Sequence, residues 1–130
     1  MHLRKAKKND LDSVYKLIYS ATRRGKILKR TQDDLRNILH CFWVAEQEGV
    51  IYACCSLEIY NKKLAEIRSL VVDPVKEKKG IASALVDHCI KEAKEKGIYE
   101  VLVITNRENL FRRHGFSEQL HDQKALFLRP

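Results

Sequence analysis

The stretch from residue 64 to residue 105 constrains the fold of this chain more than any other. The apolar run "LAEIRSLVV" over 64–72 predicts a strand that stops at an Asp-Pro pair. A helix over 80–96 follows, with one apolar face and a glycine stop. The next run, "YEVLVIT" over 99–105, is a continuous apolar strand suited to a covered sheet. Such a β-α-β unit predicts two parallel neighbouring strands.

The remaining segments add helices and antiparallel strands. In chain order we expect a strand at 2–6, helices at 9–25 and from Thr31, a hairpin at 41–60, a short helix at 108–115 and a last strand at 124–129. The predicted fold class is α/β (α+β), with a mixed twisted central sheet flanked by helices. At this length we expect one domain over residues 1–130.

The formal charge of +8 is concentrated in residues 1–30, which hold ten basic and two acidic side chains. This segment favours an anionic partner, although a solvated basic face is an equally good reading. The aromatic residues lie mostly in apolar strands, so we do not expect nucleic acid as a partner. No apolar run approaches the roughly 20 residues of a membrane span. We therefore expect no membrane partner and a cytoplasmic protein without a signal peptide.

Four cysteines occur, at positions 41, 54, 55 and 89, and none forms a C-x-x-C pair. No histidine has zinc-finger spacing, so we expect no metal site. Cys54 and Cys55 are neighbours in a predicted strand and should point to opposite faces of the sheet. We expect reduced, mostly buried thiols, with a metal ligand or a nucleophile as the less favoured alternatives.

The turn "DPVKEKKGIAS" over 73–83 has the composition of a phosphate site. The first turn of a helix presents backbone N–H groups at the positive end of its dipole, and such an end binds phosphate. Gly80 allows a phosphate to approach the backbone, and three lysines at 76, 78 and 79 add positive charge. Neither a Walker loop nor a G-x-G-x-x-G pattern is present, so a plain turn with solvated lysines stays an alternative.

The order of the elements and the motif "EKKGIA" over 77–82 resemble the GNAT superfamily of acetyl-CoA-dependent N-acetyltransferases. The family motif is Q/R-x-x-G-x-G/A. Gly80 and Ala82 match it, whereas Glu77 stands where Arg or Gln is usual. The resemblance covers essentially the whole chain. It implies acetyl-CoA as the cofactor and a small-molecule amine as the substrate.

Three stretches are similar to the acetyltransferase domain of N-acetylglutamate synthase: "RGKILKRT" (24–31), "LAEIRSLVVDP" (64–74) and "VLVITNRENLFRRHGF" (101–116). This resemblance makes an amino acid such as glutamate a candidate acceptor. The synthases carry further substrate contacts in a longer loop after 116, where this sequence reads "SEQLHDQKALFLRP". That departure favours another amino acid, a polyamine-like amine or a peptide terminus. Family members often dimerise, so a homodimer stays open.

The resemblance also implies which residues bind the cofactor. The backbone of strand 64–72 would bind the pantetheine arm, with an N–H near Leu70 as the oxyanion donor. Phe111 replaces the tyrosine that many family members use as an acid, and we expect it beside the pantetheine or in the core. The predicted cofactor-binding residues are Leu70, Val71, Val72, Lys78, Lys79, Gly80, Ile81, Ala82, Ser83 and Phe111.

A free amine near neutral pH is mostly protonated, so acetyl transfer to it needs a base. Glu66 is the candidate, because it sits in an otherwise apolar strand and the synthases have a glutamate there with a proposed base role. Its even spacing from Leu70 predicts that both side chains share a face. The alternative is a structural carboxylate paired with Arg68. Thr105 or Asn106 could protonate the leaving thiolate.

Arg30, in "ILKR", matches an arginine that meets a substrate carboxylate in the synthase-like enzymes. A guanidinium suits a carboxylate because it offers two parallel hydrogen bonds. Arg68 is the second predicted substrate-binding residue. The alternative for Arg30 is an exposed side chain in a basic segment.

A different class of function is a GNAT-fold module that binds acyl-CoA or a partner without transferring acetyl. Glu77 and Phe111 favour that reading, whereas the glutamate at 66 argues for an enzyme.

Overall fold

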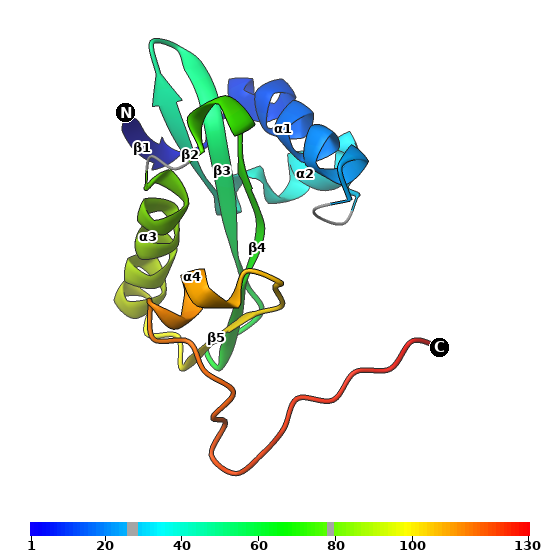
Figure 1. The fold of residues 1–130 in the computed structure, drawn as a ribbon, viewed down its shortest axis with the longest axis vertical. Helices are drawn as coiled ribbons and strands as arrows, with labels where there is room; N and C mark the ends of the chain where they lie inside the picture. The colour runs from blue at the N-terminus through cyan, green and yellow to red at the C-terminus, as the bar shows by residue number, and fades with distance from the viewer. Residues whose placement is uncertain (26–28, 78–79) are drawn as a thin grey trace.

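The computed structural model of the chain describes residues 1–25, 29–77 and 80–130. They form one mixed sheet in the order β1-β2-β3-β4-β5, with helices on both faces (Figure 1). The strands are β1 (His2–Lys5), β2 (Phe42–Gln47), β3 (Val50–Ile59), β4 (Leu64–Val72) and β5 (Glu100–Val103). The helices are α1 (Leu11–Arg23), α2 (Gln32–Ile38), α3 (Ile81–Glu95) and α4 (Glu108–Arg112), with 3₁₀ turns at Lys8–Asp10, Leu39–Cys41 and Pro74–Lys76. None of these described helices is both long and apolar enough to cross a membrane.

The strand directions follow the predicted pattern. Neighbours from β1 to β4 are antiparallel, whereas β4 and β5 are parallel and joined through α3. The β2-β3 hairpin turns at Glu48 and Gly49, whose φ angles are 51° and 78°. Two consecutive positive φ angles are what a type I′ turn requires. The α+β fold, the hairpin and the β-α-β unit are therefore confirmed.

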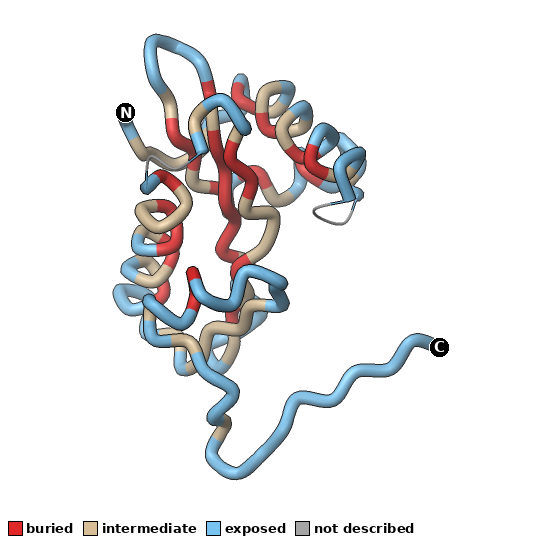
Figure 2. Tube along the Cα trace, in the orientation of Figure 1, coloured by how far each residue is buried: buried red, intermediate tan, exposed pale blue. Residues whose placement is uncertain are grey.

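Two apolar layers hold the sheet between its helices, and they contain most of the buried chain (Figure 2). Cys54 belongs to the layer against α1 and α2, and Cys55 to the layer beneath α3, so the neighbouring thiols face opposite sides as predicted. Burial raises the pKa of the Cys54 thiol to about 12. All four cysteines are free, and Cys54, Cys55 and Cys89 are fully buried. The three buried thiols act as small apolar side chains of the core.

The end of the chain differs from the prediction. Residues 124–129 were expected to form a strand, but they have no regular secondary structure and lead away from the domain (Figure 1). Leu126 and Leu128 are 87% and 85% exposed. A strand needs a hydrogen-bonded neighbour, which a local apolar pattern does not supply. The strand expected at 99–105 is also shorter than predicted, since β5 spans only Glu100–Val103. It forms an edge of the sheet and is half-buried, whereas a covered strand was expected.

An ion-pair cluster fastens the start of the chain to the sheet. Arg4 Nη1 lies 2.7 Å from Asp10 Oδ2, and Arg4 Nη2 lies 2.6 Å from Glu46 Oε1. The Asp10 carboxylate also accepts the Lys7 backbone N–H at 2.7 Å. The hydrogen bond from Arg4 is the main cause that lowers the pKa of Asp10 below its ordinary value. β1 and the helix that follows it are held together by these contacts.

Replacing Asp10 by alanine should lower the free energy of unfolding by about 3 kcal/mol, because Arg4 then lies partly buried without its main partner. Since the folded-state pKa of Asp10 is depressed, its contribution is complete above the ordinary value of 3.8 and is lost as the pH falls below it. Urea unfolding at pH 7 and pH 3 measures both effects. Exposed Asp12→Ala is the control and should change stability by no more than about 0.5 kcal/mol. A similar loss at both pH values would contradict the assignment.

Candidate active site

β4 and β5 pair over only part of their length. The parallel ladder joins 64–67 of β4 to 100–103 of β5, although β4 continues to Val72. A cavity of about 590 Å³ lies where the two segments diverge. Its lining comes from 67–72 of β4, from 103–107 at and beyond the end of β5, from Ala21 and Arg24 around the end of α1, and from Glu77 and Phe111. The predicted residues Leu70, Val71, Val72, Arg68, Thr105, Asn106 and Phe111 are all in this lining.

A β-bulge in β4 shapes this cavity. Ser69 has a φ of 53°, although it is not a glycine, and the register with β3 shifts by one residue at this point. Ile67 and Leu70 both pack in the layer beneath α3, so Glu66 points to the opposite face. The prediction that Glu66 and Leu70 share a face is therefore wrong, because the bulge inserts one residue into the alternation.

The cavity residue Glu77 precedes the N-terminus of α3 by a few residues in sequence. Gly80 is the N-cap residue with a φ of 72°, and no described side chain caps the helix. The N–H groups of the first turn, from Ile81 to Ser83, are thus available to an anion. The predicted contacts Lys78 and Lys79 lie outside the described residues.

A chain of polar contacts ties α3 to the segment after α4. Ser83 Oγ lies 2.9 Å from His114 Nε2, and His114 Nδ1 lies 2.9 Å from Asp87 Oδ1. The side chain of Ser83 is thus engaged by the protein, so its backbone N–H is the group that it can offer to an anion. His114 and Asp87 were not identified from the sequence, because they lie on separate elements.

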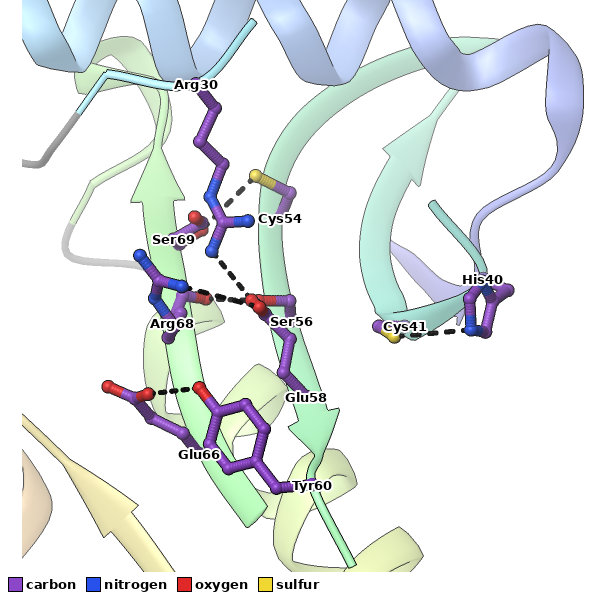
Figure 3. A network of polar contacts seen from close by, with 10 residues as sticks. All are labelled: Arg30, His40, Cys41, Cys54, Ser56, Glu58, Tyr60, Glu66, Arg68 and Ser69. Carbon is purple, nitrogen blue, oxygen red and sulfur yellow. Dashed lines mark hydrogen bonds and ion pairs between the residues drawn. The ribbon is translucent and has the colours of Figure 1, made fainter. Parts of the chain in front are cut away.

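Glu66 has a hydrogen-bond partner that the sequence did not indicate. The Tyr60 hydroxyl donates to Glu66 Oε1 at 2.5 Å, and Arg68 contacts a different carboxylate (Figure 3). The alternative of a Glu66–Arg68 pair is thus wrong. Partial desolvation and the hydrogen bond to Glu66 raise the pKa of Tyr60 to about 12, so its hydroxyl stays protonated at neutral pH. Glu66 is not among the described residues that line the cavity.

The segment after β5 supplies the other side of the cavity. Thr105 Oγ1 accepts the Arg107 backbone N–H at 2.8 Å, which leaves the threonine hydroxyl proton free to be donated. Asn106 lies beside it and is exposed. Phe111 is 3% exposed and packs edge-to-face on Phe116, with ring centroids 5.4 Å apart. Phe111 therefore belongs to the core as well as to the cavity lining.

Arg30 and Arg68 meet at Glu58, a residue of β3 that the sequence did not single out (Figure 3). Arg30 Nη2 lies 2.7 Å from Glu58 Oε2, and Arg68 Nη1 lies 3.5 Å from Glu58 Oε1. The Ser56 hydroxyl donates to Glu58 Oε2 at 2.7 Å. The side chain of Arg30 is only 9% exposed, so the alternative of an exposed surface arginine is wrong.

The cavity carries more positive than negative charge. Arg24, Arg68 and Arg107 line it, with Glu77 as the acidic residue of the lining. Guanidinium groups bind phosphates and carboxylates. A cavity of this charge, whose residue Glu77 precedes a helix N-terminus in sequence, is suited to an anionic ligand.

Comparisons with known proteins identify the family of this chain. The Acetyltransferase (GNAT) domain family matches residues 39–118. An uncharacterized N-acetyltransferase of Chlorobaculum tepidum is 33% identical over 116 residues, which are 89% of this chain and 75% of that protein. An amino-acid acetyltransferase of Mycobacterium tuberculosis is also 33% identical, over 89% of this chain and 68% of its own length.

A solved structure extends the likeness to the fold. N-acetylglutamate synthase from Neisseria gonorrhoeae, complexed with coenzyme A and N-acetyl-glutamate, superposes with a TM-score of 0.84 at 27% identity. The match covers 94% of this chain and 29% of that one. The resemblance to the acetyltransferase domain of such synthases is thereby confirmed. The chain belongs to the GNAT family and is an acetyltransferase of that family.

Proposed function

We propose that residues 1–130 act as one domain that transfers acetyl from acetyl-CoA to the amino group of a small molecule, with an amino acid as the acceptor class. The amine attacks directly while both substrates are bound. The divergence of β4 from β5, together with the N-terminus of α3 that follows β4 in sequence, carries this proposal.

The described residues fit acetyl-CoA. Beyond Ile67, the side of β4 that faces the cavity has no ladder with β5 and is suited to a linear amide-bearing arm such as pantetheine. Leu70, Val71 and Val72 would offer backbone groups to that arm, and the Leu70 N–H would be the oxyanion donor. The amides of Gly80 to Ser83 would bind the pyrophosphate, together with Lys78 and Lys79. When bound, acetyl-CoA supplies an acetyl group activated as a thioester.

Proton transfer is assigned to Glu66, in the part of β4 that pairs with β5, and to a side chain of the segment after β5. Glu66 takes the proton of the acceptor amine through a water, since its carboxylate lies outside the cavity lining. Tyr60 holds that carboxylate in place and stays protonated while it does so. Thr105 or Asn106 protonates the leaving thiolate from the opposite wall.

A second candidate function is binding of acyl-CoA without acetyl transfer. It is favoured by Phe111, which has no acidic proton at the position that the resemblance assigns to an acid, and by the carboxylate of Glu77 in the cavity lining. Both functions require cofactor binding, but only the acetyltransferase turns over an acceptor.

Gly80→Asp should weaken acetyl-CoA binding by about tenfold or more, because it places a carboxylate where the pyrophosphate would bind. Gly80→Asn is the matched control: it has nearly the same shape, tolerates a positive φ and carries no charge. Nothing lies within 4 Å of an added Cβ at this position, and the positive φ strains both variants alike, so their comparison isolates the charge. Titration calorimetry measures both dissociation constants. Equal affinities for the two variants would mean that the turn binds no phosphate.

Glu66→Gln should lower kcat by about 10²-fold or more, because the amide cannot accept the amine proton. The dissociation constant of acetyl-CoA should stay at the wild-type value, since Glu66 is not in the cavity lining. Tyr60→Phe should cause a smaller loss, because it removes only the hydrogen bond that holds Glu66. Steady-state kinetics with an amino-acid acceptor, beside calorimetry, separates the two effects. Unchanged kcat in Glu66→Gln would remove it from the mechanism.

A further inference from the structure

Glu58 binds Arg30 as a ligand carboxylate would (Figure 3). The two side chains are 12% and 9% exposed, and their closest atoms are 2.7 Å apart. Ser56 donates a further hydrogen bond to the same carboxylate oxygen. A buried charge of this kind needs its partner, so removal of either one leaves the other unpaired at a high cost. Arg30 thus has a carboxylate partner before any acceptor binds.

Arg68 is less fully engaged than Arg30. Its contact to Glu58 is 3.5 Å long, its side chain is 35% exposed, and it lines the cavity. A carboxylate of an acceptor can approach Arg68 from the cavity without displacing Glu58. Arg68 is thus the guanidinium of the pair that a ligand in the cavity can reach.

Two acidic side chains face each other across β3 and β4. Glu58 and Glu66 are directly opposite in the register, and both point to the same face of the sheet as Arg30 and Arg68. With the two arginines and the two glutamates charged, this cluster is neutral. A second acceptor carboxylate that reached this cluster would add a negative charge beside two glutamates, and Arg30 already has a carboxylate partner there. The repulsion between this carboxylate and the two glutamates would weaken the binding of acidic ligands.

We propose that Glu58 determines the acceptor class: it occupies Arg30, so that the acceptor is an α-amino acid whose side chain carries no carboxylate. The α-carboxylate of that acceptor binds Arg68, and its amino group lies toward Glu66. This proposal rests on the proposed acetyltransferase function, and it assigns to Arg30 the role of a structural partner in place of a substrate contact.

Binding of glutarate tests the proposal without turnover, because this probe has two carboxylates and no amine. Calorimetry in the presence of coenzyme A should show that Glu58→Gln binds glutarate about tenfold tighter than the wild type, or more, since a released guanidinium gains a charged partner. Glu95→Gln, the same change at an exposed site on α3, should bind it as the wild type does. Equal affinity of the Glu58→Gln and wild-type proteins overturns the proposal.

The double variant Arg30→Gln/Glu58→Gln shows whether Arg30 is the group that binds glutarate in the Glu58→Gln variant. It should bind glutarate no more tightly than the wild type, because the released guanidinium is missing. Tight binding by the double variant overturns the role of Arg30. If Glu58→Gln does not fold, the side-chain N–H signals of Arg30 in the wild type take its place: they should not shift when glutarate is added, and a shift overturns the proposal.

Turnover distinguishes this proposal from the proposed function. The wild type should acetylate glutamine in preference to glutamate, and Glu58→Gln should raise the ratio of kcat/KM for glutamate over glutamine by about tenfold or more. A wild type that uses both equally overturns the role of Glu58. If no amino acid is acetylated by any variant, the proposed acceptor class fails, while the glutarate comparison still tests how Glu58 blocks Arg30.

Discussion

The loss of pairing between β4 and β5 beyond Ile67 is the constraint on which the rest of the site depends. β4 continues for several residues after the ladder ends, because its other edge stays paired with β3 and its side chains enter both apolar layers. The bulge at Ser69 turns the strand at this point. The backbone groups of β4 that would pair with β5 in a complete sheet thereby face a cavity. These residues precede the N-terminus of α3 in sequence.

Ion pairs take up part of the positive charge of the N-terminal segment. Arg4 is paired with Asp10 and Glu46, Lys5 with Glu92, and Arg30 with Glu58. These contacts join the segment to other elements of the fold. Among the described residues, Arg24, Arg68 and Arg107 line the cavity and can contact an anion in it.

Patterns that depend on neighbouring residues were readable from the sequence. The periodicity of α3, its glycine at position 80 and the two apolar strands around it predicted the β-α-β unit and the place of the candidate anion site. Features that depend on distant partners were not readable. The bulge at Ser69 appears only in the register with β3, and Glu58 meets Arg30 across 28 residues of sequence. The strand expected at 124–129 failed for the same reason, since an apolar alternation does not supply a partner.

The most direct test of the account is a backbone amide NMR titration of the protein with coenzyme A. The account predicts the largest shifts at Leu70–Val72 in β4 and at Ile81–Ser83 in the first turn of α3, with little change in β1 and β2. Binding with unshifted amides in both of those segments would contradict the claim that the divergent strands and the helix N-terminus form the cofactor site.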